Sequence, residues 1–150
     1  MRTLNRAIRL LMIEDNPGDV RLVREAFRES KRNVDIEAIG DGETAVTRLL
    51  AVGRGLEHSA PDLIILDLNI PRRNGFEVLT IIKESHVLHS IPVIILTSSS
   101  AQDDIIRAYD LHSNCYVTKP GDFNEFFSTI THLEKFWFDT VRIPHTKEVE

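Results

Sequence analysis

Short apolar runs alternate with amphipathic segments along this chain. Three of the runs are almost continuously hydrophobic, which is typical of strands buried on both faces of a parallel sheet. A fourth run alternates apolar and polar residues, which favours an edge strand, and a fifth is weaker. The predicted strands are the continuous Ile8–Ile13, Leu63–Leu66 and Val93–Leu96, the alternating Val34–Ile39 and the weaker Asn114–Thr118.

Helical patterns lie between the predicted strands. The first helix begins at Asn16, a favourable N-cap, with Pro17 in the first helical position and Asp19 where the helix dipole favours an anion. Further helices are predicted over Glu43–Leu50, Phe76–Glu84 and Asp103–Leu111, and a long last helix starts at Phe123. This alternation predicts a right-handed, doubly wound parallel sheet of five strands with helices on both faces.

Composition restricts the class of protein. The chain has 150 residues, of which 42% are hydrophobic and 27% charged, so we expect one globular domain over residues 1–150. No segment is apolar enough to span a membrane or to act as a signal peptide, and the single Cys115 fits a reducing compartment. We therefore expect a cytoplasmic protein with no membrane partner. The net charge of −5 argues against nucleic acid as a partner.

Polar residues follow every predicted inner strand. Glu14 and Asp15 come after the first run, Asp67 and Thr97 after the next two, and Lys119 after the last. Parallel strands end at one edge of their sheet, where ligands of such folds bind, so these side chains are expected to converge there.

Three carboxylates in one place need a cation to stay ionised together. Oxygen ligands suit Mg²⁺, which is held by one or two carboxylates together with waters and phosphate oxygens. Glu14, Asp15 and Asp67 are therefore candidate Mg²⁺ ligands, and the backbone carbonyl of Asn69 could complete the metal shell.

A carboxylate can also act as the nucleophile in phosphoryl transfer and form an aspartyl phosphate. If Asp67 attacks, Lys119 can supply a cation to one phosphoryl oxygen and the Thr97 hydroxyl can donate to another. In the simpler interpretation, Thr97 only satisfies a strand end.

The order and spacing of these groups resemble a receiver domain of a two-component response regulator. The resemblance covers about residues 8–131, and the motifs that carry it are IEDNP, ILDLNIP, LTS and TKP. Within the family, EDNPGD, LDLNIPR, NCYVTKP and a late FW are most similar to the single-domain regulators that partner bacterial phytochromes. The long last helix and a C-terminal tail then extend the receiver core to residue 150.

The resemblance implies a flavodoxin-like sheet with strand order 2-1-3-4-5. It also implies that Asp67 accepts a phosphoryl group from the phosphohistidine of a sensor histidine kinase, and that phytochromes are candidate kinases. Glu14, Asp15 and the Asn69 carbonyl are then expected to hold Mg²⁺. Such a protein is a signalling switch and not an enzyme, apart from its own phosphorylation and dephosphorylation.

The resemblance further implies how the switch works. Phosphorylation draws the Thr97 hydroxyl inward, and Tyr116, three residues before the lysine, rotates inward behind it. The Lys119–Pro120 bond is then expected to be cis, at a cost of about 0.5 to 1 kcal/mol. In the alternative interpretation, Tyr116 is an ordinary core aromatic residue.

Two other functions use similar parts. A Mg²⁺-dependent phosphatase would also form an aspartyl phosphate on Asp67, but it needs an acid two residues later, where this chain has Asn69. A flavin-binding module of the same sheet order needs hydrogen-bond donors after the first strand, where Glu14 and Asp15 would repel a phosphate.

Aromatic residues are concentrated in the last helix. Six of the ten aromatic residues of the chain lie between Phe123 and Phe138, more than one helix readily buries against a small sheet. Such residues either pack into the core or form an interface, and we expect a homodimer in which Phe127 and Trp137 lie at the interface.

Overall fold

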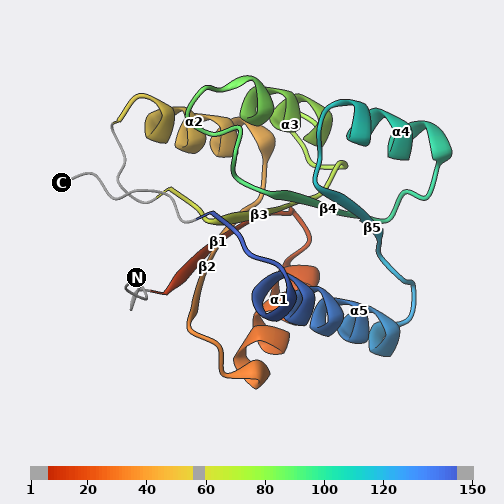
Figure 1. Cartoon of the computed structure of the whole chain (residues 1–150). Helices are drawn as coiled ribbons and strands as arrows, with labels where there is room; N and C mark the ends of the chain where they lie inside the picture. Colours follow the sequence, from red (N-terminus) through yellow and green to blue (C-terminus); the bar gives the residue numbers. More distant parts are fainter. Residues whose placement is uncertain (1–6, 56–59, 145–150) are drawn as a thin grey trace.

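The five apolar runs form one parallel sheet in the computed structural model, which describes residues 7–55 and 60–144 (Figure 1). The strand order is β2-β1-β3-β4-β5, so the alternating run is an edge strand, and the continuous runs are central. The flavodoxin-like order is thereby confirmed. The strands are β1 (Ile8–Ile13), β2 (Val34–Ile39), β3 (Leu63–Leu66), β4 (Val93–Thr97) and β5 (Cys115–Thr118).

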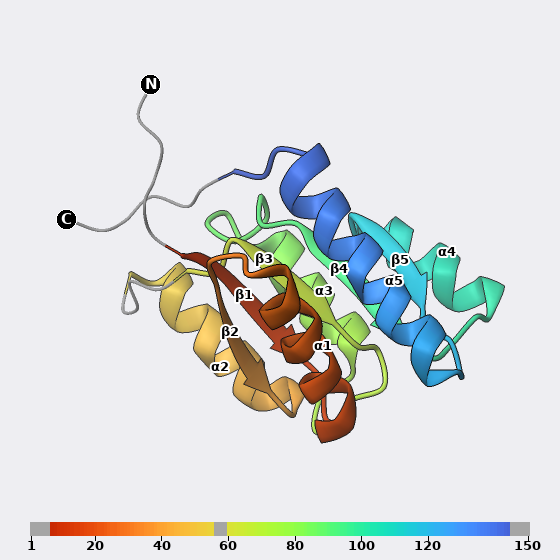
Figure 2. The same cartoon turned by 90° about the horizontal axis from the view of Figure 1, so that it is seen from below.

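Helices cover both faces of the sheet, as the alternation predicted. Figures 1 and 2 show α1 (Pro17–Ser30) and α5 (Phe123–Lys135) side by side on one face. The other face carries α2 (Gly42–Gly53), α3 (Gly75–Glu84) and α4 (Gln102–Asp110). The buried apolar residues accordingly divide into two clusters, one on each side of the strands.

The strand register determines which residues meet at the carboxyl edge, the edge of the sheet at which all five strands end. Ile13 pairs with Leu66, so the next residues, Glu14 and Asp67, are neighbours. The Asp67 amide donates to the Ile13 carbonyl at 3.0 Å, which extends this pairing by one residue.

Local signals position the helices next to that edge. The Asn16 side chain accepts hydrogen bonds from the amides of Gly18, at 2.9 Å, and Asp19, at 3.2 Å, and Pro17 occupies the first turn as predicted. Helix α1 therefore begins immediately after β1. Asp19 is thereby held in the first turn, next to the end of the strand.

Gly75 allows α3 to approach the loop after β3. A Cβ atom at this position would lie 2.4 Å from the Asp67 carbonyl oxygen and 2.6 Å from the Leu68 Cα. Any other residue would displace the loop, because real Cβ atoms do not come so close to backbone. The Gly75 amide also donates to the Leu68 carbonyl at 2.9 Å, so the helix start supports the backbone around Asp67.

The last helix is less regular than the pattern predicts. Helix α5 ends at Lys135 and continues as the π-helix η1 (Phe136–Thr140). Arg32, which follows α1, attaches this segment to the rest of the fold. It pairs with the buried Glu134 and donates to Asp139 at 2.9 Å. Its guanidinium also lies 5.5 Å from the Phe138 ring centroid. The end of the helix is thus tied to α1.

No helix within residues 7–55 and 60–144 is long and apolar enough to cross a membrane.

Candidate functional site

All the polar residues expected at the strand ends lie at the carboxyl edge. Glu14 and Asp15 follow β1, Asp67 follows β3, Thr97 ends β4, and Lys119 follows β5. Thr97 pairs with Thr118 in the register of β4 and β5, and the Lys119 amide donates to the Thr97 carbonyl at 2.7 Å. The sheet therefore brings together groups from four separate strands.

The carboxylates form one cluster. One oxygen each from Glu14, Asp15 and Asp67 lies within 4.8 Å of the others, with Glu14 and Asp67 buried and Asp15 exposed. Burial, together with the nearby charge of Asp67, raises the pKa of Glu14 to about 7. An arrangement of oxygen donors with this much negative charge fits a hard divalent cation.

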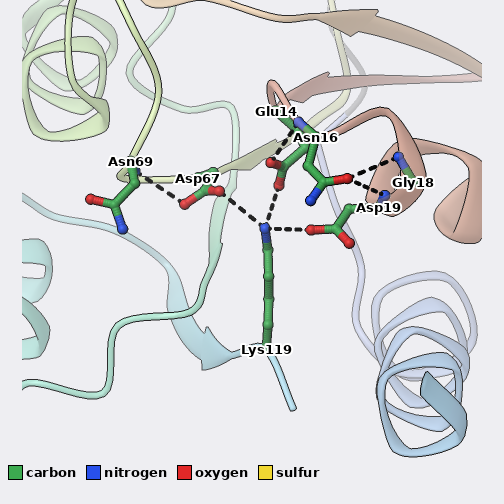
Figure 3. Close-up of polar contacts among 7 residues, drawn as sticks. All are labelled: Glu14, Asn16, Gly18, Asp19, Asp67, Asn69 and Lys119. Atoms are coloured by element: carbon green, nitrogen blue, oxygen red, sulfur yellow. Dashed lines mark hydrogen bonds and ion pairs between the residues drawn. The ribbon is translucent and has the colours of Figure 1, made fainter. Parts of the chain in front are cut away.

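Asp67 is kept ionised despite its burial. Burial acts to raise its pKa, but hydrogen bonds and the charge of Lys119 outweigh this effect and lower it below the ordinary value. The Asn69 amide donates to Asp67 Oδ1 at 3.1 Å, and Lys119 Nζ donates to Oδ2 at 3.0 Å (Figure 3). The ionised carboxylate is the form of aspartate that can act as a nucleophile.

Lys119 is the centre of the charge network. Figure 3 shows its side chain extended from the end of β5 toward three carboxylates, and Nζ lies 2.7 Å from Glu14 Oε1 and 2.8 Å from Asp19 Oδ2, besides Asp67. Burial alone would lower the pKa of the ammonium, but these carboxylates raise it above the usual range. Lys119 is therefore a permanent cation next to Asp67.

Asp19 is the site residue that the sequence analysis missed. The pattern assigned it only a favourable position in the helix dipole, whereas the structure places its carboxylate on Lys119. A signal was available in hindsight, because residues in the first turn of a helix that follows a central strand lie beside the carboxyl edge.

Thr97 supplies a hydroxyl without a partner. Its side chain is fully buried, and its Oγ1 makes no hydrogen bond to any group in the described part of the chain. The hydroxyl nevertheless lies near enough to Asp67 to contribute to the lowering of that residue's pKa. A buried donor that is free beside an ionised carboxylate fits an oxygen-rich ligand on Asp67 better than a mere strand end.

Tyr116 lies on β5, on the side of the sheet that carries α4. Its ring is half-buried against the core, and its hydroxyl donates to the Ser99 carbonyl at 2.9 Å. This contact connects the residue to the loop that follows Thr97. The structure thus links the two proposed switch residues through one loop.

One expectation for the site is wrong. The Lys119–Pro120 bond is trans, not cis. The trans form is the preferred one even before proline, and with it the ammonium of Lys119 already reaches Asp67. The expectation, which came from the resemblance to receiver domains, does not hold in this structure.

The residues expected at an interface are only partly exposed. Phe127 and Trp137 are half-buried and pack against the core cluster beneath α1 and α5. The exposed large hydrophobic residues in this region are instead Phe123, at 68%, and Phe136, at 50%.

Comparison with known proteins gives consistent matches over nearly the whole chain. The sequence model of the response regulator receiver domain matches residues 10–131. Response regulator Rcp1 of Synechocystis sp. is 39% identical over 135 residues, which are 90% of this chain and 92% of Rcp1.

Two solved structures are similar in both sequence and fold. The phosphorylated cyanobacterial phytochrome response regulator RcpA is 39% identical with a TM-score of 0.87, over 93% of this chain and 99% of that one. The Mn²⁺-bound form of Rcp1 is 38% identical with a TM-score of 0.86, over 92% of this chain and 99% of that one.

Proposed function

The chain belongs to the response regulator receiver domain family, and on this basis we propose that Asp67 is its phosphoryl acceptor. The observation that carries the proposal is a buried, ionised Asp67 in contact with Lys119 at 3.0 Å, with the partnerless hydroxyl of Thr97 nearby. Phosphoryl transfer to a carboxylate uses a nucleophilic oxygen, a positive charge near the phosphoryl group and a hydrogen-bond donor to its oxygens, and Asp67, Lys119 and Thr97 can supply these.

The transfer step uses these groups as follows. An Asp67 carboxylate oxygen attacks the phosphorus of a phosphohistidine, the new O–P bond forms, and the P–N bond breaks. The electron pair of the P–N bond returns to the imidazole nitrogen of the kinase, which takes up a proton. Lys119 then donates to one phosphoryl oxygen and Thr97 to another, so negative charge on the group is stabilised by donors already in place.

A divalent cation is part of this proposal. The family and the three-carboxylate cluster support a metal site, and we assign its ligands to Glu14, Asp15, Asp67 and the carbonyl of Asn69. Mg²⁺ is our choice because oxygen ligands and phosphate oxygens are what it prefers, and when bound it would neutralise charge on the transferred group.

A sensor histidine kinase is the partner that a receiver domain implies. A groove of about 620 Å³ opens beside Asp19 and Lys119, between α1 and α5. Its walls include Leu22, Phe126 and the exposed Phe123. We propose that the phosphohistidine-bearing domain of the kinase docks along this groove. The similarity to RcpA, a phytochrome response regulator, supports the further proposal that this kinase is of the phytochrome type.

The signal would leave through a surface of the same domain. Residues 1–150 are proposed to form one receiver domain, with Thr97 and Tyr116 converting phosphorylation into a change of the loop at Ser99. We further propose a cytoplasmic homodimer that does not bind nucleic acid and turns over no free substrate. The phosphatase alternative is not favoured, because Asn69 cannot supply the acid that it needs.

The proposal is tested by intact-mass analysis after incubation with Mg²⁺ and acetyl phosphate. The parent protein should gain one phosphoryl group that is stable in acid and lost in mild base. Asp67→Asn should gain none, and Asp110→Asn, which removes an exposed carboxylate from α4, should behave like the parent. An unmodified parent, or a modified Asp67→Asn variant, would show that Asp67 is not the acceptor.

A further inference from the structure

Asp19 has a different relation to Lys119 than the other two carboxylates have. Glu14 and Asp67 belong to the cluster whose oxygens could share a cation, whereas Asp19 does not. Its side chain is 21% exposed and still lies 2.8 Å from Lys119 Nζ. Lys119 therefore has one counter-ion that is independent of the metal cluster.

The hydrogen bonds of Lys119 are fully used. An ammonium group has three N–H donors and no acceptor. In this structure they go to Glu14, Asp19 and Asp67 at 2.7, 2.8 and 3.0 Å. A phosphoryl oxygen can bind Lys119 only if one of these three contacts is given up.

The chemistry of the site decides which contacts change. Phosphorylation alters Asp67 directly, and Glu14 would bind the cation. Asp19 is the one partner whose oxygens neither event requires. Its position is also fixed locally, because the Asn16 side chain accepts from the Asp19 amide at 3.2 Å at the start of α1.

We propose that Asp19 is a positioning residue for Lys119. It holds the ammonium at the carboxyl edge while the ammonium exchanges its contacts with Glu14 and Asp67 for a contact with the phosphoryl group. The inference rests on the proposed function of Asp67. Without Asp19, the buried ammonium has only the two cluster carboxylates as charged partners, so it competes with the cation for them. A neutral residue at position 19 should therefore weaken both cation binding and phosphorylation.

A purely structural role for Asp19 makes a different prediction. An anion in the first turn of α1 stabilises the helix through its dipole. Loss of that effect would lower the stability of the protein but would not change the chemistry of Lys119. The test must therefore measure Lys119 itself.

The experiment compares Asp19→Asn, Asp19→Glu and Glu29→Gln. Glu29 is an exposed residue of the same helix that does not line the groove, so Glu29→Gln removes an equal charge from α1 without removing a partner of Lys119. Solvent exchange of the Lys119 ammonium is measured by ¹⁵N NMR in metal-free protein. Mn²⁺ affinity is measured by calorimetry, and the phosphorylation rate is measured by intact mass with acetyl phosphate.

Asp19→Asn is expected to speed up ammonium exchange, to weaken Mn²⁺ binding and to slow phosphorylation by about tenfold. Asp19→Glu should restore most of the rate, and Glu29→Gln should match the parent. In a Lys119→Met background, Asp19→Asn should change the remaining rate by less than about twofold, because a residue that acts through Lys119 has no effect without it.

Two results would overturn the inference. One is an unchanged ammonium exchange and phosphorylation rate in Asp19→Asn, which would leave only the role in the helix. The other is an equal loss of rate with and without Lys119, which would mean that Asp19 acts on the donor directly. If the parent itself is not phosphorylated, the proposed function fails instead, and the NMR measurement still decides whether Asp19 positions Lys119.

Discussion

Lys119 Nζ lies 3.0 Å from Asp67 Oδ2, although 52 residues separate them in the chain. The contact exists because β3 and β5 flank β4 and all three strands run in the same direction. Each strand needs only a polar residue after its last buried position for the sheet to bring the residues together. The site is therefore a product of strand order and register.

Cation binding should stabilise the folded protein, because it relieves the repulsion among Glu14, Asp15 and Asp67. At a free Mg²⁺ concentration of 100 times the dissociation constant, the gain in unfolding free energy should be about 2.7 kcal/mol. Thermal unfolding in EDTA and in excess Mg²⁺ measures it. Asp15→Asn, which changes the exposed member of the proposed ligand set, should lose most of the gain. Coinciding transitions of the parent in the two buffers would rule out the metal site.

Gly75→Ala should displace the backbone of Asp67 and Leu68. The new Cβ would lie 2.4 Å from the Asp67 carbonyl oxygen, so α3 or the loop must shift, with a loss of about 1 to 3 kcal/mol of unfolding free energy. The rate of phosphorylation by acetyl phosphate should fall as well. Gly121→Ala is the matched control, since no atom lies within 4 Å of its added Cβ. Equal behaviour of the two variants in urea unfolding would contradict the close approach.

Arg32→Met should loosen the end of the last helix. It leaves Glu134, only 2% exposed, without its cationic partner, at a cost of about 3 kcal/mol of unfolding free energy. The double variant Arg32→Met/Glu134→Met should recover much of this loss, because no buried charge remains. Urea unfolding measures both. Arg28→Met, at a side chain that is 74% exposed, should have little effect, and a comparable loss there would argue against the role of burial.

Asp41 should contribute to the pH dependence of stability. It caps α2 by accepting from the Thr44 amide, and this hydrogen bond is the main reason that its pKa lies below the ordinary value of 3.8. A depressed carboxyl pKa stabilises the folded state above the unfolded-state pKa, and this stabilisation is lost as the pH falls through the folded-state pKa.

Asp41→Asn keeps a good capping residue but removes the titrating charge. The variant should therefore be less stable than the parent at pH 7 and should approach it as the pH is lowered to about 3. Urea unfolding midpoints at these pH values test the prediction. A stability difference that does not change with pH would mean that the charge of Asp41 plays no part.

Self-association should depend on Phe136. This ring is half-exposed and contacts Trp137 edge-on with 5.8 Å between ring centroids, so Phe136→Ser changes the surface with little effect on the core. We expect the dimer dissociation constant to rise at least about tenfold in sedimentation velocity. Phe123→Ser, at the other end of α5, is the control. A parent that is monomeric at micromolar concentration would contradict the dimer.

The local pattern was sufficient for the elements and for most of the site. Three strands have the predicted bounds, namely Ile8–Ile13, Val34–Ile39 and Leu63–Leu66. Their bounds could be predicted because the pattern of apolar residues is a local property of the sequence. The residues after the strands were predictable for the same reason. Once the strands were known, the rule that parallel strands end at one edge placed Asp67 and Lys119 together.

Contacts between distant segments were not predictable in this way. Asp19 touches Lys119 across 100 residues, and Arg32 pairs with Glu134 across 102. The sequence around Asp19 and Arg32 does not indicate which residues they contact, since these contacts depend on how α1 and α5 pack against the sheet. The half-burial of Phe127 and Trp137 was decided by the same packing.

The sequence by itself therefore determined the order of elements, the family and the chemical groups at the carboxyl edge, because these follow from local periodicity and short motifs. Tertiary structure alone decided that Lys119 has three carboxylate partners and that the last helix ends in a π-helical turn. The physical reason is that burial and hydrogen bonding between separate elements select among the conformations and contacts that the local sequence allows.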